Sequence, residues 1–180
     1  VDWEHMQTGL VPDMSKGINA IGSGSTIITS DNEVVAFHSH STGNGGMKFW
    51  KTQFTDTNLT GWEHVKDNPV LTLDYPGLPP FDDFWRDPFV FSTNGRTFLI
   101  CCADLFDADY VPVPIFEAKN SALTEWEYKG ILFTVPKHKY RNLEVPDFRQ
   151  IGDKWLFTAS TDAPVDRCIY FVGTFNIEDL

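Results

Sequence analysis

Charged and hydroxyl side chains recur where short apolar segments of this sequence begin. In chain order these residues are Ser23 and Ser25, then Arg86 and Asp87, then Glu144 and Asp147. If the fold brings the segments together, two carboxylates can face one pocket. Glycoside hydrolysis needs that arrangement, with one group as acid and another as nucleophile or base. Proximity of like charges raises the pKa of one carboxyl, so that it stays protonated near neutral pH.

Aromatic residues close to these positions are candidates for stacking on sugar faces. They are Phe84, Trp85 and Trp50. Pro88 is expected to hold Asp87 in an extended conformation, because a proline restricts the residue before it. The alternative is structural, with the carboxylates capping strands and pairing with arginines. The arginines in question are Arg86, Arg141 and Arg149.

Strands must position these residues, because helical periodicity is nearly absent and β-rich runs separated by turn residues dominate. The expected strands are 25–29, 33–39, 47–54, 89–91, 97–103, 115–118, 145–150, 154–160 and 169–175. Asn94-Gly95 and Gly152-Asp153 have the composition of tight hairpin turns. The sequence therefore predicts an all-β fold.

A repeat organises the expected strands. Similar segments around Trp3, Trp62 and Trp126 recur at intervals of 59 and 64 residues. Each is followed by a loop with a proline, then by one of the polar strand starts, a hairpin and a third strand. Together with the tryptophan-bearing strand, this unit has the four antiparallel strands of a β-propeller blade. A β-sandwich with coincidental tryptophan spacing is the alternative, although three features recur in phase.

The predicted architecture is thus a β-propeller of four-stranded antiparallel blades, of which this chain would hold about three. Blade boundaries are expected near 1–20, 21–66, 84–129 and 143–180, in one partial propeller domain over 1–180 with no second domain visible. Propellers close with about four to eight blades. Flanking blades or self-association would therefore complete the ring.

Composition narrows the range of partners and cofactors. The net charge of −11 and a pI near 4.7 disfavour nucleic acid and membrane, since both repel a negative surface. Cys101 and Cys102 are adjacent, so on a strand they face opposite sides and are expected to be buried structural thiols. His38 and His40 share a strand face, but no third ligand accompanies them in the sequence. No metal site and no cofactor are predicted.

Two of the polar motifs resemble signatures of glycoside hydrolase family 32, the invertases, inulinases and levanases. They are Arg86-Asp87-Pro88 and Glu144-Val145-Pro146-Asp147, the latter with Val145 where the family has Cys. Further similarity lies in Asp2-Trp3-Glu4-His5, Gly22-Ser23-Gly24-Ser25 and Tyr170-Phe171-Val172-Gly173-Thr174-Phe175. The set follows the family's order through nearly all 180 residues.

The resemblance implies a five-bladed propeller and a retaining glycosidase for β-fructofuranosyl linkages of the sucrose, inulin or levan type. Glu144 would be the general acid/base and Asp87 the transition-state stabiliser. The substrate-binding residues would be Arg86, Ser23, Ser25, Trp85 and Asp147. The partner would be a fructose-containing oligo- or polysaccharide. The usual nature of such substrates favours an extracellular or periplasmic location.

Two departures from the family pattern matter. The nucleophilic Asp of the family's Asn-Asp-Pro-Asn-Gly motif has no counterpart here, because neither Asp2 nor Asp13 has the flanking residues. We therefore expect the 180-residue chain alone to be inactive. Gly22 stands where an aromatic residue is usual, which leaves the substrate preference open.

Two other functions remain open at this point. An arabinan- or xylan-acting propeller hydrolase would share the architecture and a central Asp, but its chemistry is inverting. A non-catalytic carbohydrate-binding propeller would fit the missing nucleophile and Gly22.

Overall fold

The computed structural model describes residues 2–6, 8–41, 47–56, 58, 60–163 and 167–179. The strands are β1 (Ala20–Ile28), β2 (Val34–Ser41), β3 (Met47–Phe54), β4 (Trp62–His64), β5 (Phe81–Thr93), β6 (Arg96–Leu105), β7 (Tyr110–Ala118), β8 (Trp126–Pro136), β9 (Glu144–Ile151), β10 (Lys154–Ser160) and β11 (Cys168–Gly173). The short helices are η1 (Met14–Lys16), α1 (Lys137–Tyr140) and η2 (Ile177–Asp179). Within these ranges no helix has the length and apolar character needed to cross a membrane.

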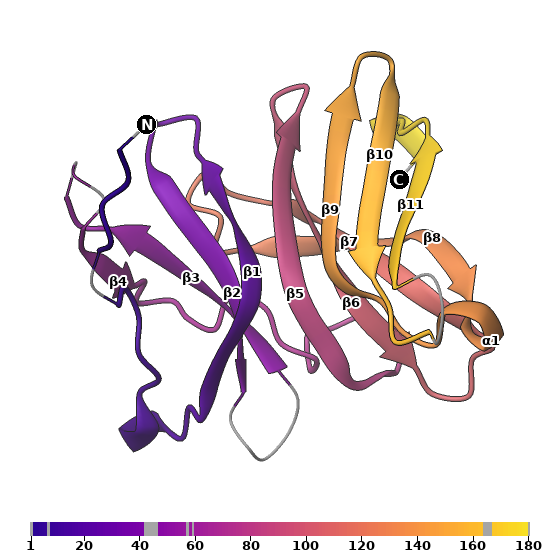
Figure 1. The fold of residues 1–180 in the computed structure, drawn as a ribbon, viewed down its shortest axis with the longest axis horizontal. Coiled ribbons are helices and arrows are strands. Elements are labelled where there is room, and N and C mark those ends of the chain that lie inside the picture. The colour runs from indigo at the N-terminus through magenta and orange to yellow at the C-terminus, as the bar shows by residue number, and fades with distance from the viewer. Residues whose placement is uncertain are drawn as a thin grey trace.

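The strands form three antiparallel sheets that follow the chain. The orders are β1-β2-β3-β4, β5-β6-β7-β8 and β11-β10-β9. Trp62 opens β4 and Trp126 opens β8, so the repeated tryptophan marks the fourth strand of each complete sheet, as the repeat predicts. Figure 1 shows the sheets side by side, with β5 packed between β1 and β9. The strands that carry the candidate polar residues are therefore neighbours in space.

Turn chemistry explains two of the hairpins. Asn94 and Gly95 both have positive φ, 50° and 74°, and they join Thr93 directly to Arg96. Such a two-residue loop matches the right-handed twist of the strands that it connects. Gly152, with φ of 63°, begins the loop between β9 and β10. Both predicted hairpins are confirmed.

β5 differs most from its predicted bounds, because it begins eight residues before the expected start at Phe89. Asp82, Asp83 and Arg86 interrupt the apolar pattern that the sequence offers. The structure accommodates them with shifts of register against β6 between Phe81 and Trp85 and again between Arg86 and Phe89. A bulge of this kind keeps a strand paired while it redirects side chains.

Two apolar clusters fill the spaces between the sheets. One joins the first sheet to the second and contains Phe37, Phe49 and Cys101. The other joins the second sheet to the third and contains Cys102 and Phe148. Both thiols are fully buried and belong to different clusters, so the prediction of structural thiols on opposite faces of β6 is confirmed.

Trp85 belongs to the first of these clusters. Its side chain is fully buried, and its indole stacks on Phe49 with ring centroids 5.1 Å apart. The prediction that Trp85 binds substrate is therefore wrong for this structure, because no sugar can reach a fully buried ring. The alternation of β5 between two buried faces explains the error. An aromatic residue beside a polar motif can serve the core as readily as a pocket.

Candidate active site

The polar segments of β1, β5 and β9, here called the inner strands, each coincide with an irregularity in strand pairing. Register shifts occur in β1 between Ile21 and Gly24, in β5 between Arg86 and Phe89, and in β10 opposite the start of β9. Bulges are over-represented beside active sites because they redirect side chains. Strand pairing is thus irregular at the places where the sequence puts its candidate residues.

Two non-glycine residues in this region have a left-handed backbone. Asp87 has a φ of 59° and Val145 a φ of 50°. The prediction that Pro88 holds Asp87 extended is wrong, because the bulge in β5 overrides the local preference of a residue before proline. A β-branched residue such as Val145 rarely adopts a positive φ, so its conformation stores strain. Such strain persists only where surrounding contacts hold it.

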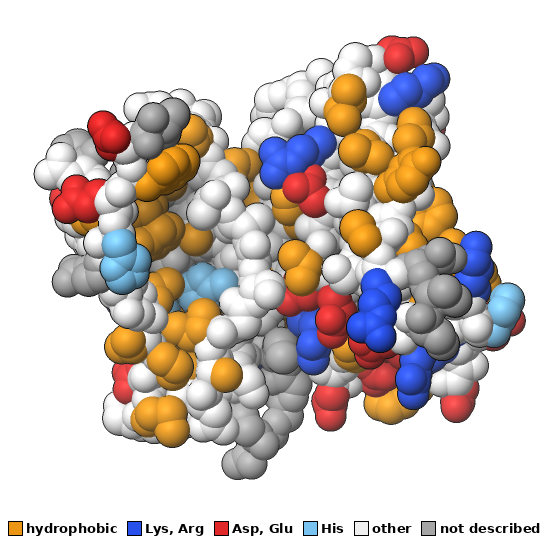
Figure 2. All heavy atoms as spheres, viewed as in Figure 1, with side chains coloured by type: hydrophobic (Ala, Val, Ile, Leu, Met, Phe, Trp, Pro, Cys, Tyr) orange, Lys and Arg blue, Asp and Glu red, His pale blue; other side chains and the backbone are white. Residues whose placement is uncertain are grey.

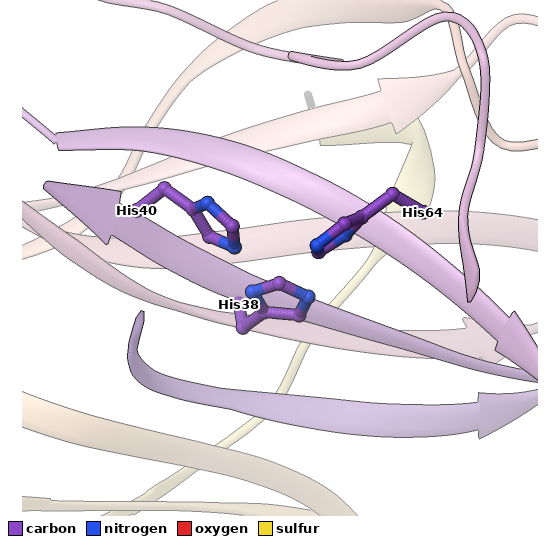
Figure 3. Close-up of side chains that lie close together, drawn as sticks. All are labelled: His38, His40 and His64. Atoms are coloured by element: carbon purple, nitrogen blue, oxygen red, sulfur yellow. The ribbon is translucent and has the colours of Figure 1, made fainter. Parts of the chain in front are cut away.

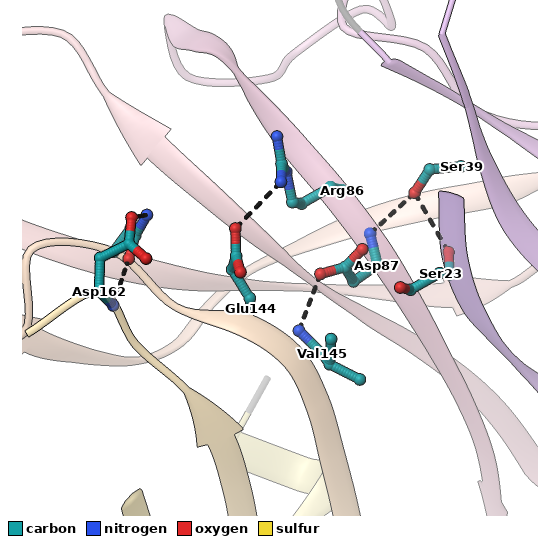
Figure 4. Close-up of polar contacts among 8 residues, drawn as sticks. Ser23, Ser39, Arg86, Asp87, Glu144, Val145 and Asp162 are labelled. Atoms are coloured by element: carbon teal, nitrogen blue, oxygen red, sulfur yellow. Dashed lines mark hydrogen bonds and ion pairs between the residues drawn. The ribbon is translucent and has the colours of Figure 1, made fainter. Parts of the chain in front are cut away.

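Asp87 makes hydrogen bonds to both neighbouring sheets, and these bonds hold Asp87 and Val145 in their conformations. Its Oδ2 accepts a hydrogen bond from the Val145 amide at 2.8 Å, and its own amide donates to Ser39 Oγ at 2.9 Å. Ser39 Oγ in turn donates to the carbonyl oxygen of Ser23 at 3.3 Å. Figure 4 shows this chain of contacts crossing from β1 and β2 through β5 to β9. Asp87 is only 6% exposed.

Burial alters the acidity of Asp87. Removal from water raises the pKa of its carboxyl above the usual range, while the Val145 amide and the Arg86 guanidinium oppose that rise. Ionisation of this carboxyl therefore costs free energy in the folded protein, and the two donors offset part of that cost.

Arg86 links Asp87's strand to Glu144. Its Nη1 lies 3.0 Å from Glu144 Oε1, and its guanidinium lies 4.5 Å from the centre of the Phe84 ring. The side chains of Arg86 and Glu144 are about one-third exposed, at 31% and 32%. The Glu144 carboxylate is therefore accessible to a ligand or to water while Arg86 holds its position.

The segment before Glu144 is anchored from the other side. Asn142 Nδ2 donates to Asp162 Oδ2, and the Asp162 amide donates to Asn142 Oδ1, both at 3.0 Å. This pair of bonds ties the chain entering β9 to the chain leaving β10. Figure 4 shows Asp162 on the far side of Glu144 from Asp87.

The other predicted site residues have different surroundings. Ser25 Oγ accepts a hydrogen bond from the Val90 amide at 2.9 Å, which joins β1 to β5. Asp147 pairs with Arg149 through Arg149 Nε, at 2.7 and 2.9 Å. The structural alternative in which the carboxylates pair with arginines therefore describes both Glu144 and Asp147. Ser23 is exposed and uses its carbonyl oxygen.

A groove of about 930 Å³ runs along the three inner strands and is lined by Ser25, Phe89, Val145, Asp147 and Arg149, among others. Figure 2 shows the surface hollowed between the first sheet and the other two. Acidic and basic side chains gather over the lower ends of β5 and β9, where these strands begin. The groove offers an elongated ligand a path beside Val145.

Ser39 is a site residue that the sequence analysis did not identify. It is fully buried and holds the Asp87 amide. The signal in the sequence was a small hydroxyl residue between His38 and His40 on an expected strand.

Ser25 gives the first test of this geometry. In Ser25→Ala the buried Val90 amide loses its acceptor, so the free energy of unfolding should fall by about 1–3 kcal/mol. Ser23→Ala is the matched control. It keeps the carbonyl that Ser39 uses and should change stability by less than about 0.5 kcal/mol. Urea unfolding of both variants measures the difference, and equal stabilities would contradict the inter-sheet role of Ser25.

Comparison with known proteins identifies the family. The model of the glycosyl hydrolases family 32 N-terminal domain matches residues 1–180. No curated protein matches the chain. A mutant of the Bombyx mori GH32 beta-fructofuranosidase in complex with sucrose aligns with a TM-score of 0.79 and 19% identity, over 99% of this chain and 38% of that chain.

Two further solved structures share the fold. The Cichorium intybus fructan 1-exohydrolase IIa in complex with 1-kestose aligns with a TM-score of 0.79 and 17% identity, over 98% of this chain and 35% of that chain. A mutant of the B. megaterium levansucrase aligns with a TM-score of 0.69 and 13% identity, over 93% and 52%. The chain therefore spans 38% and 35% of the first two enzymes. The predicted propeller fold is confirmed, and the match over its whole length shows that the chain belongs to family 32 of the glycosyl hydrolases.

Proposed function

We propose that the protein carrying this chain hydrolyses β-fructofuranosyl linkages with retention of configuration. The observation that supports this most is the contact between two carboxylate-bearing strands. Asp87 bonds to the amide that follows Glu144, while Arg86 bonds to Glu144 itself. Two carboxyl groups with different surroundings can divide the tasks of proton transfer and charge stabilisation.

Glu144 acts as the general acid/base in this proposal. It donates a proton to the leaving oxygen of the substrate and later removes a proton from the attacking water. Its partial exposure allows contact with substrate, and the Arg86 guanidinium orients its carboxyl group. Asp87 stays in place through Val145 and Ser39, and hydrogen-bonds hydroxyl groups of the fructosyl ring as positive charge develops there.

The nucleophile comes from outside residues 1–180 in this proposal, on a blade adjacent to β1. It attacks the anomeric carbon and forms a covalent fructosyl-enzyme, which water then hydrolyses. Two carboxyl groups about 5 Å apart serve such a retaining mechanism, whereas an inverting one needs a wider separation. The substrate class is a fructose-containing oligo- or polysaccharide. Solved structures of the same fold in complex with sucrose and with 1-kestose support this class.

The test is to follow the anomer released by the whole protein from sucrose and from inulin by NMR. We expect fructose to be released first as the β-anomer, which is the configuration of the substrate. Early release of the α-anomer would overturn the retaining mechanism. Turnover of arabinan or xylan without turnover of fructosides would overturn the substrate class. Sugar binding by calorimetry without any turnover would favour a non-catalytic propeller instead.

A further inference from the structure

Sheet register brings three histidines to one face of the first sheet. His38 and His40 are two apart on β2, and His38 pairs with Trp50 on β3. Thr52, two residues after Trp50, pairs with His64 on β4. Because side chains alternate along strands and match across them, all five residues share one face. His64 is 24 residues beyond His40 in the sequence, which is why the sequence pattern alone offers no third imidazole.

The three side chains form a compact group, here called the histidine cluster (His38, His40 and His64). Their potential ligand nitrogens all lie within 4.8 Å of one another. Figure 3 shows the rings of His38 and His64 below and beside His40, converging on one space. Ring centroids are 4.6 Å apart for His38 and His40, and 5.3 Å for His40 and His64.

Burial makes this cluster costly without a ligand. His38 is 6% exposed and His40 is fully buried. Among the described residues, neither ring nitrogen of His38 nor of His40 finds a hydrogen-bond partner. Buried polar atoms are nearly always satisfied in native proteins, so four such nitrogens in one place call for an explanation. Apolar rings would fill the same space without leaving polar atoms unpaired.

The rings are also prepared for coordination. The Trp50 indole stacks on His40 with ring centroids 4.3 Å apart and planes 5° apart, which limits the tilt of that imidazole. Burial, with help from the neighbouring imidazoles, lowers the pKa of His38 to about 3 and that of His40 to about 4. Neutral imidazole is the form that binds metals.

We propose that His38, His40 and His64 form a binding site for a divalent transition-metal ion of the zinc class. Zinc–nitrogen bonds of 2.0–2.1 Å require ligand nitrogens roughly 3.3 Å apart in a tetrahedron, so modest ring rotations from the present separations suffice. Three imidazoles leave the fourth position for water. The all-nitrogen donor set disfavours calcium and magnesium, which prefer oxygen.

The site would brace the strand that supports the candidate active site. Ser39 lies between His38 and His40, and alternation directs it to the opposite face, where its hydroxyl accepts from the Asp87 amide. A metal that holds both flanking side chains would limit movement of Ser39. The role is structural, because the cluster and Asp87 lie on opposite faces of β2.

Titration of the purified protein with Zn²⁺ by calorimetry tests the proposal. We expect one ion per chain. His64→Gln should weaken binding by more than the ~10–100-fold typical of losing an outer-shell partner, since it removes a direct ligand. His64 is the least buried of the three, so this variant disturbs the core least. His138→Gln, at an exposed position on α1, is the matched control and should bind like the wild type.

The visible spectrum of the Co²⁺-loaded wild type gives an independent readout. A tetrahedral histidine site should produce intense d–d bands that His138→Gln retains and His64→Gln loses. Absence of Zn²⁺ binding in the wild type would overturn the site, and so would equal affinity in His64→Gln and His138→Gln. If His64→Gln fails to fold, weak octahedral Co²⁺ bands in the wild type would overturn it equally.

Discussion

The Glu144→Gln variant of the complete protein should turn over fructosides with a kcat about 10²–10⁴-fold below that of the wild type, the usual contribution of a general acid. Glutamine keeps the size of the side chain, and its carbonyl oxygen can still accept from Arg86 Nη1. It cannot protonate the leaving oxygen. Initial rates of fructose release across a range of substrate concentrations measure the effect.

The control for this variant is Glu178→Gln, which removes a carboxylate that is 84% exposed in η2. Its kcat should match the wild type. The loss in Glu144→Gln should shrink for an aryl fructoside with a good leaving group, because such a group departs with little protonation. Near wild-type turnover of sucrose by Glu144→Gln would refute the assigned role.

The Asp87→Asn variant should lose activity on a similar scale, with a kcat lower by about 10²–10³-fold, as is usual when one transition-state contact is removed. The amide oxygen of asparagine can still accept from the Val145 amide, so the backbone geometry should survive. The negative charge that would face the developing positive charge is lost. The same kinetic measurement applies.

The stability of Asp87→Asn distinguishes the loss of a catalytic contact from misfolding of the variant. Burial raises the pKa of Asp87, so its ionised form opposes folding. The wild type should therefore lose stability relative to Asp87→Asn as pH rises from about 4 through the raised pKa of Asp87. At neutral pH the variant should unfold at an equal or higher urea concentration. A clearly lower urea midpoint together with lost activity would instead assign Asp87 a structural role.

Much of the fold follows from local patterns in the sequence. The tryptophan repeat located β4 and β8, because Trp62 and Trp126 open the strands that complete their sheets, whereas Trp3 lies outside any strand. Asn94-Gly95 predicted its hairpin because both residues tolerate the positive φ that the loop requires. β3 and β10 have the predicted bounds, since their turn residues and alternation agree.

The details of the candidate site depend on contacts that local patterns do not encode. Proximity of Arg86 to Glu144 could be anticipated only from the repeat and the family resemblance. The left-handed backbone of Asp87 is held by Val145 and Ser39, which belong to other sheets. Burial of Trp85 depends on Phe49 in the first sheet. The third histidine likewise appears only when the register of β3 and β4 is known.

The bonds that define the candidate site join residues far apart along the chain. Asp87 is 48 positions from Ser39 and 58 from Val145, and Arg86 is 58 from Glu144. Loops of that length must close before such bonds can form, and folds rich in non-local pairs assemble slowly. Hairpins within each sheet are far more local. The proposed activity would thus report sheet docking rather than strand formation, and a molecule with native secondary structure but misdocked sheets would lack this site altogether.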